Sequence, residues 1–294
     1  MHSLSQRPFF VLLMGLGALA MVIPAVHALS VSNHAVARAF FFFALLFFVL
    51  TLFIGLATAS YKLALSRGYL VSLLAAFLVL PVMLAVPMYE AVPKMTYLEA
   101  WFESVSSFTT TGATLFDNPT ELPRSVHLWR SLMGWLGGLL IWISAIAILA
   151  PLNIGGFEVR AIHGGSASEK TFAQVGRASD PSERLFRFGA KLVPLYFALT
   201  ALLWLGLTAA GENSFVAMCH AMSVMATSGI SPVGGIILSP AGFAGEFIIV
   251  IFFAFALSRV TFSRGVSGQE INPLRKDSEF RIALIMIGAL VAVL

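Results

Sequence analysis

The chain has 294 residues, of which 59% are hydrophobic and only 11% are charged. A soluble domain carries about 25% charged residues, so this composition excludes an ordinary water-soluble globule and indicates a protein that lives in a lipid bilayer. The net charge of +4 arises without a polybasic run, so no nucleic-acid partner is expected, and a single cysteine excludes an intrachain disulfide.

Seven apolar stretches have the composition of transmembrane helices, each of which needs about 20 residues. We predict spans at residues 9–29, 38–60, 69–90, 126–150, 189–210, 241–262 and from 281 onward. The expected fold class is therefore an all-α polytopic membrane protein. The first stretch has the alternative of a signal peptide, because Arg7 precedes it and Val26-His27-Ala28 resembles a cleavage site, but its length and the span that follows favour a membrane helix.

The distribution of Lys and Arg predicts the orientation of the chain. With the N-terminus in the cytoplasm, 14 of the 18 basic residues lie on the inner side and four lie on the outer side. We therefore expect a cytoplasmic N-terminus. The longest polar stretch, residues 155–189, is then a cytoplasmic loop, and Asp180-Pro181 within it predicts the start of the next helix.

The last apolar stretch is too short to cross the bilayer. Residues 282–294 make about 20 Å of helix, whereas the hydrocarbon core is about 30 Å thick. We therefore expect a C-terminally truncated polypeptide, with a short re-entrant end as the alternative.

The segment between the third and fourth spans predicts a half-helix. Thr96 and Glu99 have the spacing of a capping box, and residues 96–108 make about 20 Å of helix, enough to reach part-way into a bilayer. Small hydroxyl residues and a glycine follow at Thr109–Thr114, and the chain then turns back at Asn118-Pro119. The segment therefore predicts a re-entrant loop.

The same pattern recurs 117 residues later along the chain. Asn213 takes the place of Thr96 as the capping residue, an apolar half-helix covers residues 213–225, and a hydroxyl-hydroxyl-Gly-x-hydroxyl turn covers residues 226–231. A long span follows each copy, so the repeating unit is span, half-helix, turn, span.

The two turns have the composition of a site for a dehydrated monovalent cation. Glycine accepts a positive φ, so successive carbonyl oxygens can face a common axis and replace the hydration shell of the ion. The C-terminal end of each half-helix adds a negative dipole, and Thr and Ser add neutral oxygens. The candidate ion-binding residues are Thr110, Thr111, Gly112, Ala113, Thr227, Ser228, Gly229 and Ile230. We expect the ion to be cargo and expect no resident cofactor.

Four motifs resemble the Trk/Ktr superfamily of bacterial potassium transporters, in particular its TrkH-like branch. They are the turns Thr109–Thr114 and Ala226–Ser231, with Leu128-Trp129-Arg130 and Trp135-Leu136-Gly137-Gly138. The resemblance implies four membrane-pore-membrane repeats around a pseudo-fourfold pore, preceded by two extra helices. It also implies K⁺ uptake through a selectivity filter, a bacterial inner-membrane location, a homodimer, and a cytosolic nucleotide-binding regulatory ring (TrkA-like) as a partner.

The resemblance divides the chain into five segments. They are an N-terminal pair of transmembrane helices (1–66), pore repeat 1 (67–160, with half-helix 96–108 and filter turn 109–114), a cytoplasmic loop (161–188), pore repeat 2 (189–264, with half-helix 213–225 and filter turn 226–231), and a cytoplasmic loop with the incomplete first helix of repeat 3 (265–294).

Two departures from the family pattern limit what the resemblance implies. Repeats three and four are absent, so the chain alone is not expected to conduct. The alternative function is therefore a non-conducting membrane subunit or fragment that needs a partner chain. In addition, Ser228 stands where many relatives have glycine, which makes the ion preference less secure.

A sulfur-rich cluster on the second half-helix has two interpretations. The cluster consists of Met218, Cys219, His220, Met222 and Met225. Thioether, thiol and imidazole ligands suit Cu(I), which would indicate a soft-metal transporter. The helical spacing of the three methionines instead favours simple packing, and we prefer that interpretation.

Charged residues inside or close to the apolar stretches also have two interpretations. Glu103 is either an acidic group near the pore mouth or an acceptor for a neighbouring backbone bond. Arg130 and Glu246 are either functional charges within the membrane or interfacial side chains that reach water. No catalytic motif is present in the sequence, so an enzyme is not expected.

Overall fold

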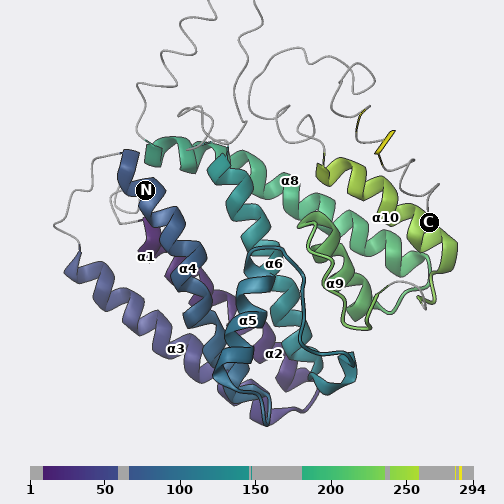
Figure 1. Ribbon diagram of the computed structural model, residues 1–294, viewed down its shortest axis with the longest axis horizontal. Helices are drawn as coiled ribbons and strands as arrows, with labels where there is room; N and C mark the ends of the chain where they lie inside the picture. Colours follow the sequence, from purple (N-terminus) through teal and green to yellow (C-terminus); the bar gives the residue numbers. More distant parts are fainter. Residues whose placement is uncertain are drawn as a thin grey trace, which may run out of the picture.

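The computed structural model describes residues 9–58, 66–145, 147, 181–235, 239–257, 282, 285 and 286. Within these residues the regular structure is entirely helical (Figure 1). The helices are α1 (Phe9–Ala20), α2 (Val22–Ser30), α3 (His34–Ala57), α4 (Ser66–Ala91), α5 (Tyr97–Phe108), the 3₁₀ helix η1 (Pro119–Glu121), α6 (Arg124–Ser144), α8 (Pro181–Ala209), α9 (Ser214–Met225) and α10 (Gly242–Leu257).

Among the residues that the structure describes, five helical stretches are long and apolar enough to cross a membrane. They are Phe9–Ser30, His34–Ala57, Val71–Ala91, Arg124–Ser144 and Leu185–Ala209, and each coincides with a predicted span. The sixth predicted span contains the shorter helix α10. Most of the seventh span lies outside the described residues, as do residues 161–180 and 265–281 of the two predicted cytoplasmic loops. The division into five segments stays a prediction.

The first predicted span is two helices, α1 and α2, that meet at Met21. Pro24 has no backbone N–H, so the carbonyl of Ala20 loses the donor that would continue the helix. Met21, Ala25 and Ala28 are nevertheless fully buried in the main hydrophobic core. Because this segment packs into the core with the other membrane helices, the structure favours a membrane helix over a signal peptide for residues 9–29.

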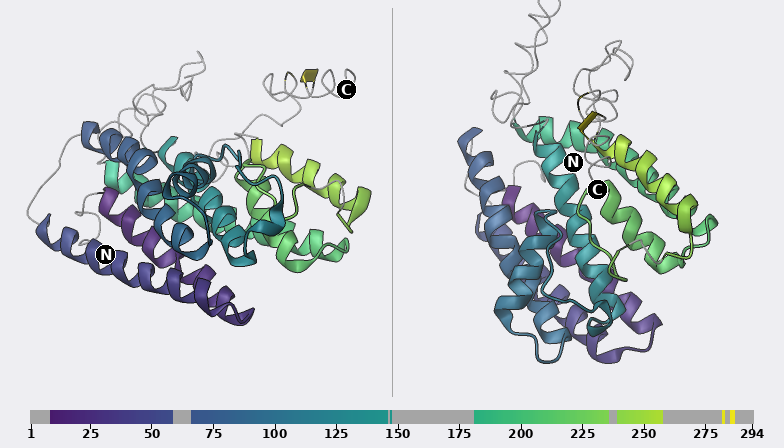
Figure 2. Two further views of the ribbon diagram at one scale, coloured as in Figure 1. Left: turned by 60° about the horizontal axis from the view of Figure 1, so that its bottom comes forward. Right: turned by 45° about the vertical axis from the view of Figure 1, so that its right-hand side comes forward.

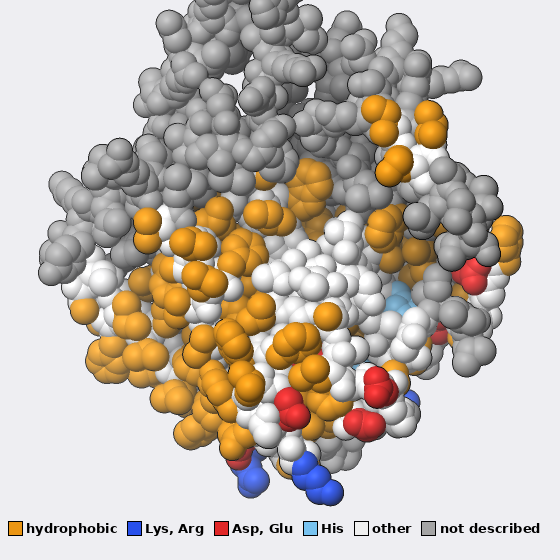
Figure 3. All heavy atoms as spheres, viewed as in Figure 1, with side chains coloured by type: hydrophobic (Ala, Val, Ile, Leu, Met, Phe, Trp, Pro, Cys, Tyr) orange, Lys and Arg blue, Asp and Glu red, His pale blue; other side chains and the backbone are white. Residues whose placement is uncertain are grey.

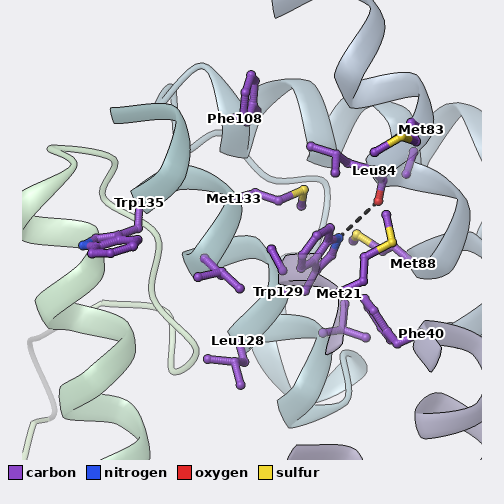
Figure 4. Packing of buried hydrophobic residues seen from close by; sticks show 14 of the residues in the cluster. Met21, Phe40, Met83, Leu84, Met88, Phe108, Leu128, Trp129, Met133 and Trp135 are labelled. Carbon is purple, nitrogen blue, oxygen red and sulfur yellow. Dashed lines mark hydrogen bonds between the residues drawn. The ribbon is translucent and has the colours of Figure 1, made fainter. Parts of the chain in front are cut away.

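Helix α6 lies at the centre of the described structure, while α3 lies at its edge. In the α6 span 78% of the most apolar stretch is buried inside the protein, whereas in the α3 span only 28% is buried. Trp129 of α6 is fully buried, its indole N–H donates to the Leu84 carbonyl of α4 over 3.1 Å, and its ring contacts Phe40 of α3 edge-on (Figure 4). The exposed apolar side chains of α3 and α4 cover one side of the molecule, as expected for a lipid-facing surface (Figure 3).

A second group of helices, α8, α9 and α10, packs on the other side of α6 (Figures 1 and 2). Trp135 of α6 faces this group: its indole N–H donates to the Thr200 hydroxyl over 2.9 Å, and its ring lies against Tyr196 at 5.0 Å between centroids. The chain therefore forms two units of the predicted kind, α4–α5–turn–α6 and α8–α9–turn–α10, with α6 shared between the two half-helices α5 and α9.

Candidate ion-binding site

Both half-helices begin at the predicted capping residues. The Thr96 hydroxyl accepts the Glu99 backbone N–H over 3.3 Å, and the Glu99 carboxylate accepts the Thr96 N–H over 2.7 Å, so the predicted capping box is formed. This bond from the backbone lowers the pKa of Glu99. In the second repeat the Asn213 side chain accepts the Phe215 N–H over 3.1 Å. The caps fix where each half-helix starts.

The two half-helices end in the same hydrogen-bond pattern. In the first repeat the Thr111 N–H donates to the Ser106 carbonyl over 2.9 Å. In the second, the Ser228 N–H donates to the Ser223 carbonyl, also over 2.9 Å. The paired residues are separated by the 117-residue offset of the sequence repeat, so the repeat is also a repeat of backbone geometry.

In both turns the backbone alternates between left-handed residues, which have a positive φ, and residues without a positive φ. The φ angles are positive at Thr110 (58°) and Gly112 (74°), and at the equivalent Thr227 (52°) and Gly229 (70°), while the residues between them do not share this conformation. Alternation of this kind turns successive peptide groups to the same side, as a carbonyl-lined ion site requires. A positive φ at threonine is strained by about 1–3 kcal/mol, and such strain gathers at functional sites.

The two turns lie directly against each other. A Cβ atom added to Gly112 would overlap the carbonyl oxygen of Ser228, whereas a Cβ atom at Gly229 would meet no atom within 4 Å. Gly112 is therefore required both for its backbone angle and for the contact between turns, and Gly229 only for its backbone angle.

A glycine face on α6 lets this helix reach the ends of both half-helices. A Cβ atom at Gly137 would overlap the carbonyl oxygen of Phe108 at the end of α5. A Cβ atom at Gly138 would lie 3.1 Å from Ala226 at the end of α9. Small residues are the usual means of close helix contact within a membrane. The motif Trp135-Leu136-Gly137-Gly138 thus has a structural purpose: it holds the two turns next to each other.

The eight candidate residues fall into three groups by exposure. Thr111, Ala113, Thr227 and Gly229 are exposed, and Thr110 and Gly112 are partly exposed. Ser228 and Ile230 are buried.

Two of these residues have contacts that bear on their role. The Ala113 carbonyl accepts the Ser106 hydroxyl over 2.6 Å, which occupies one of its lone pairs. The Ile230 side chain reaches Gly134 of α6, so it packs behind the second turn. The assignment of the eight residues as ion ligands stays a prediction.

The surroundings of Glu103 and Arg130 contradict two of the interpretations drawn from the sequence. Neither side chain reaches water, because Glu103 is 0% and Arg130 4% exposed, and they form an ion pair of 2.8 Å. The interfacial interpretation of Arg130 and the pore-mouth interpretation of Glu103 are therefore wrong, while the predicted backbone bond to Glu103 is present, from Leu115. Opposite charges that each occur in an apolar stretch are the signal that could have predicted the pair. Glu246 is exposed.

The side chains of the sulfur-rich cluster are occupied by packing and hydrogen bonding. Met222 and Met225 are buried in the main core, and the His220 ring contacts the Ser231 hydroxyl over 2.9 Å. Cys219 is fully buried. Within the part of the chain that the structure describes, no group of three or more His, Cys, Asp and Glu side chains could hold a metal ion. These contacts support the packing interpretation.

The fold and the site together define a class of protein. Two re-entrant half-helices, each ending in a turn of alternating hand and each held between apolar helices, are typical of membrane proteins that transport ions through pore loops. A sequence model of the TrkH family, described as "Cation transport protein", matches residues 34–235. The chain belongs to the TrkH family of cation transport proteins.

Individual relatives agree with this family. The chain is 31% identical over 203 residues to the Trk system potassium uptake protein TrkH of Vibrio parahaemolyticus, a match that covers 67% of this chain and 40% of the relative. It is 30% identical over 209 residues to the potassium uptake protein TrkG of Escherichia coli, covering 67% and 39%. The chain thus spans less than half the length of these curated relatives.

A solved structure confirms the predicted fold class. The crystal structure of the potassium transporter TrkH from Vibrio parahaemolyticus matches with a TM-score of 0.72 and 26% sequence identity, over 99% of this chain and 57% of that chain. The resemblance to the TrkH-like branch and the all-α polytopic membrane fold are both confirmed. The relatives named here are transport proteins.

Proposed function

We propose that this chain takes part in potassium uptake across a bacterial inner membrane, and that its two turns line part of the ion path with carbonyl oxygens. The observation that carries the proposal is the matched alternation of φ at Thr110, Gly112, Thr227 and Gly229. Both turns follow directly after the C-terminal end of a half-helix, whose negative dipole end attracts a cation. The potassium ion is cargo here, and the proposal includes no resident cofactor and no enzymatic reaction.

The oxygen chemistry favours a monovalent ion. Carbonyl and hydroxyl oxygens replace the hydration shell of an ion without a fixed negative charge, so binding stays weak enough for the ion to leave. Glu103, whose carboxylate accepts the Thr114 hydroxyl at the end of the first turn, is paired with Arg130, so the pair adds no net charge. Relatives named as potassium uptake proteins support K⁺ as the cargo.

We further propose that the N-terminus lies in the cytoplasm and that the protein assembles with partner chains. The excess of Lys and Arg in the loops predicted to be internal supports a cytoplasmic N-terminus. Family resemblance supports a homodimer and a cytosolic nucleotide-binding ring of the TrkA type as partners. The alternative, a membrane subunit that conducts only with a partner chain, belongs to the same family and uses the same turns.

A Gly112→Ala variant tests the proposal. The protein is expressed from its own gene in a bacterial strain that lacks potassium uptake, and growth at low K⁺ and the ratio of K⁺ to Na⁺ uptake are measured. We expect Gly112→Ala to reduce both, because the new Cβ atom meets the Ser228 carbonyl and opposes the positive φ. Gly206→Ala is the matched control, since its nearest side-chain atom, on Ile248, lies at an ordinary 3.6 Å.

Two outcomes decide between the interpretations. Unchanged growth and unchanged K⁺/Na⁺ discrimination in Gly112→Ala, at normal protein levels, would remove the two turns from the ion path. Uptake that appears only when a partner chain is co-expressed, and that Gly112→Ala still abolishes, would favour the subunit alternative.

A further inference from the structure

One carboxylate oxygen holds the segment that leaves the first turn. Glu103 lies on α5 and is fully buried. Its Oε1 accepts the Thr114 hydroxyl over 2.9 Å and the Leu115 backbone N–H over 2.7 Å. These two donors follow Gly112 by two and three residues, so Glu103 fixes the outgoing end of the turn to the half-helix that enters it.

The other carboxylate oxygen connects the same side chain to α6. Its Oε2 lies 2.8 Å from a terminal nitrogen of Arg130, which is 4% exposed. Glu103 therefore joins three parts of the structure: the half-helix, the outgoing segment and the central helix. A buried charge requires a partner, so loss of either residue leaves an uncompensated charge next to the turn.

The second repeat has the same connection without the charge. At the equivalent positions His220 replaces Glu103 and Ser231 replaces Thr114, and the two side chains are 2.9 Å apart. The position equivalent to Arg130 is Phe247, which is exposed. The bond from half-helix to outgoing segment thus occurs twice with different chemistry, which indicates that the position of the outgoing segment matters to both turns.

We propose that Glu103 and Arg130 are positioning residues that set the ion preference of the first turn. The incoming end of the turn is fixed by backbone bonds such as that from Thr111 to Ser106, and Glu103 fixes the outgoing end. With both ends fixed, the spacing of the carbonyl oxygens between them is fixed too, and this spacing discriminates between cations. The proposal rests on the proposed function, because it assigns a role within the same ion path.

Two isosteric variants test this role. Glu103→Gln keeps the shape and one acceptor but removes the charge, and Thr114→Val removes the donor hydroxyl alone. We expect Glu103→Gln to lower the ratio of K⁺ to Na⁺ uptake by about tenfold, since small misplacements of binding groups have large effects, and Thr114→Val to lower it by a smaller factor. Glu121→Gln, the same charge change at an exposed position, is the control and should keep the wild-type ratio.

A charge exchange separates positioning from a purely structural ion pair. The double variant Glu103→Arg/Arg130→Glu keeps opposite charges but places a donor where Thr114 and Leu115 donate. A structural pair would recover the wild-type K⁺/Na⁺ ratio in this variant, whereas a positioning carboxylate would not. Protein amount and gel-filtration profile are measured for each variant, and Thr114→Val decides if the charged variants fail to fold.

The results also separate this inference from the proposed function. Wild-type ratios in both Glu103→Gln and Thr114→Val, or recovery in the exchanged variant, would overturn the inference while a defective Gly112→Ala still supported the proposed function. A Gly112→Ala variant with normal uptake would overturn the proposed function first.

Discussion

Helices α6 and α10 follow the two turns at equivalent places in the repeats, yet their surroundings differ. Helix α6 contacts both half-helices and is largely buried, whereas Phe243, Phe247 and Val250 of α10 are exposed. Within the described residues α6 thus has protein on both sides, and α10 packs against α8 and α9. A sequence repeat fixes the local shape of each unit, and its neighbours decide which of its surfaces are buried.

The different burial of α6 and α10 also accounts for the different side chains that support the two turns. A buried position on α6 can hold Arg130, because Glu103 is there to neutralise it. The equivalent Phe247 is exposed, and the second turn is held by the neutral pair of His220 and Ser231. Backbone geometry is therefore the same in both repeats, while the side chains that support it vary with the surroundings.

The largest difference in stability is expected between variants of the two α6 glycines that contact the two half-helices. Gly137→Ala should destabilise the protein more than Gly138→Ala, because its Cβ atom would overlap the Phe108 carbonyl, whereas that of Gly138 would lie 3.1 Å from Ala226. Forcing extra atoms into a packed contact costs about 1–3 kcal/mol, occasionally more. Thermal stability in detergent, followed by gel filtration, measures the difference. Equal melting temperatures would show that α6 does not hold the first repeat more tightly than the second.

A second difference is expected between the glycines of the two turns. Both Gly112→Ala and Gly229→Ala place an L-residue at positive φ, which costs about 1–2 kcal/mol, but only Gly112→Ala also meets the Ser228 carbonyl. Gly112→Ala should therefore lower the K⁺/Na⁺ uptake ratio more. A greater loss in Gly229→Ala would mean that the Ser228 carbonyl does not limit the space beside Gly112.

The smallest difference is expected at the caps. Thr96→Ala and Asn213→Ala each remove a capping side chain, which costs about 1 kcal/mol, and Glu99→Ala removes the carboxylate that accepts the Thr96 backbone N–H. At neutral pH thermal stability should fall slightly more in the double variant Thr96→Ala/Glu99→Ala, which loses both bonds of the capping box, than in Asn213→Ala.

The Glu99 carboxylate gives this difference a pH dependence. Its pKa is lowered in the folded protein, so its contribution is complete above the unfolded-state pKa and is lost as the pH falls through the lowered folded-state pKa. The gap in stability between Glu99→Ala and the wild type should therefore narrow in acid. A gap that is constant with pH would show that the reciprocal bond contributes nothing.

Local signals were enough to predict much of the site. The spacing of Thr96 and Glu99 predicted the start of α5, and the two Gly-containing turns predicted the positions of positive φ at Gly112 and Gly229. Capping and φ preference depend on residues within one turn of each other, so they can be read along the chain. The strained φ at Thr110 and Thr227 could not be predicted, since threonine by itself avoids this conformation.

The sequence by itself determined the membrane environment, five of the spans and the repeated half-helix and turn, because these follow from composition, length and local pairing. Tertiary structure alone decided that Glu103 meets Arg130, that Gly112 meets the Ser228 carbonyl, and that Gly137 meets the end of α5. Each of these contacts joins residues that are far apart along the chain or on different helices. Such partners are fixed only when helices pack and bury charge and backbone together, and no local preference specifies that packing.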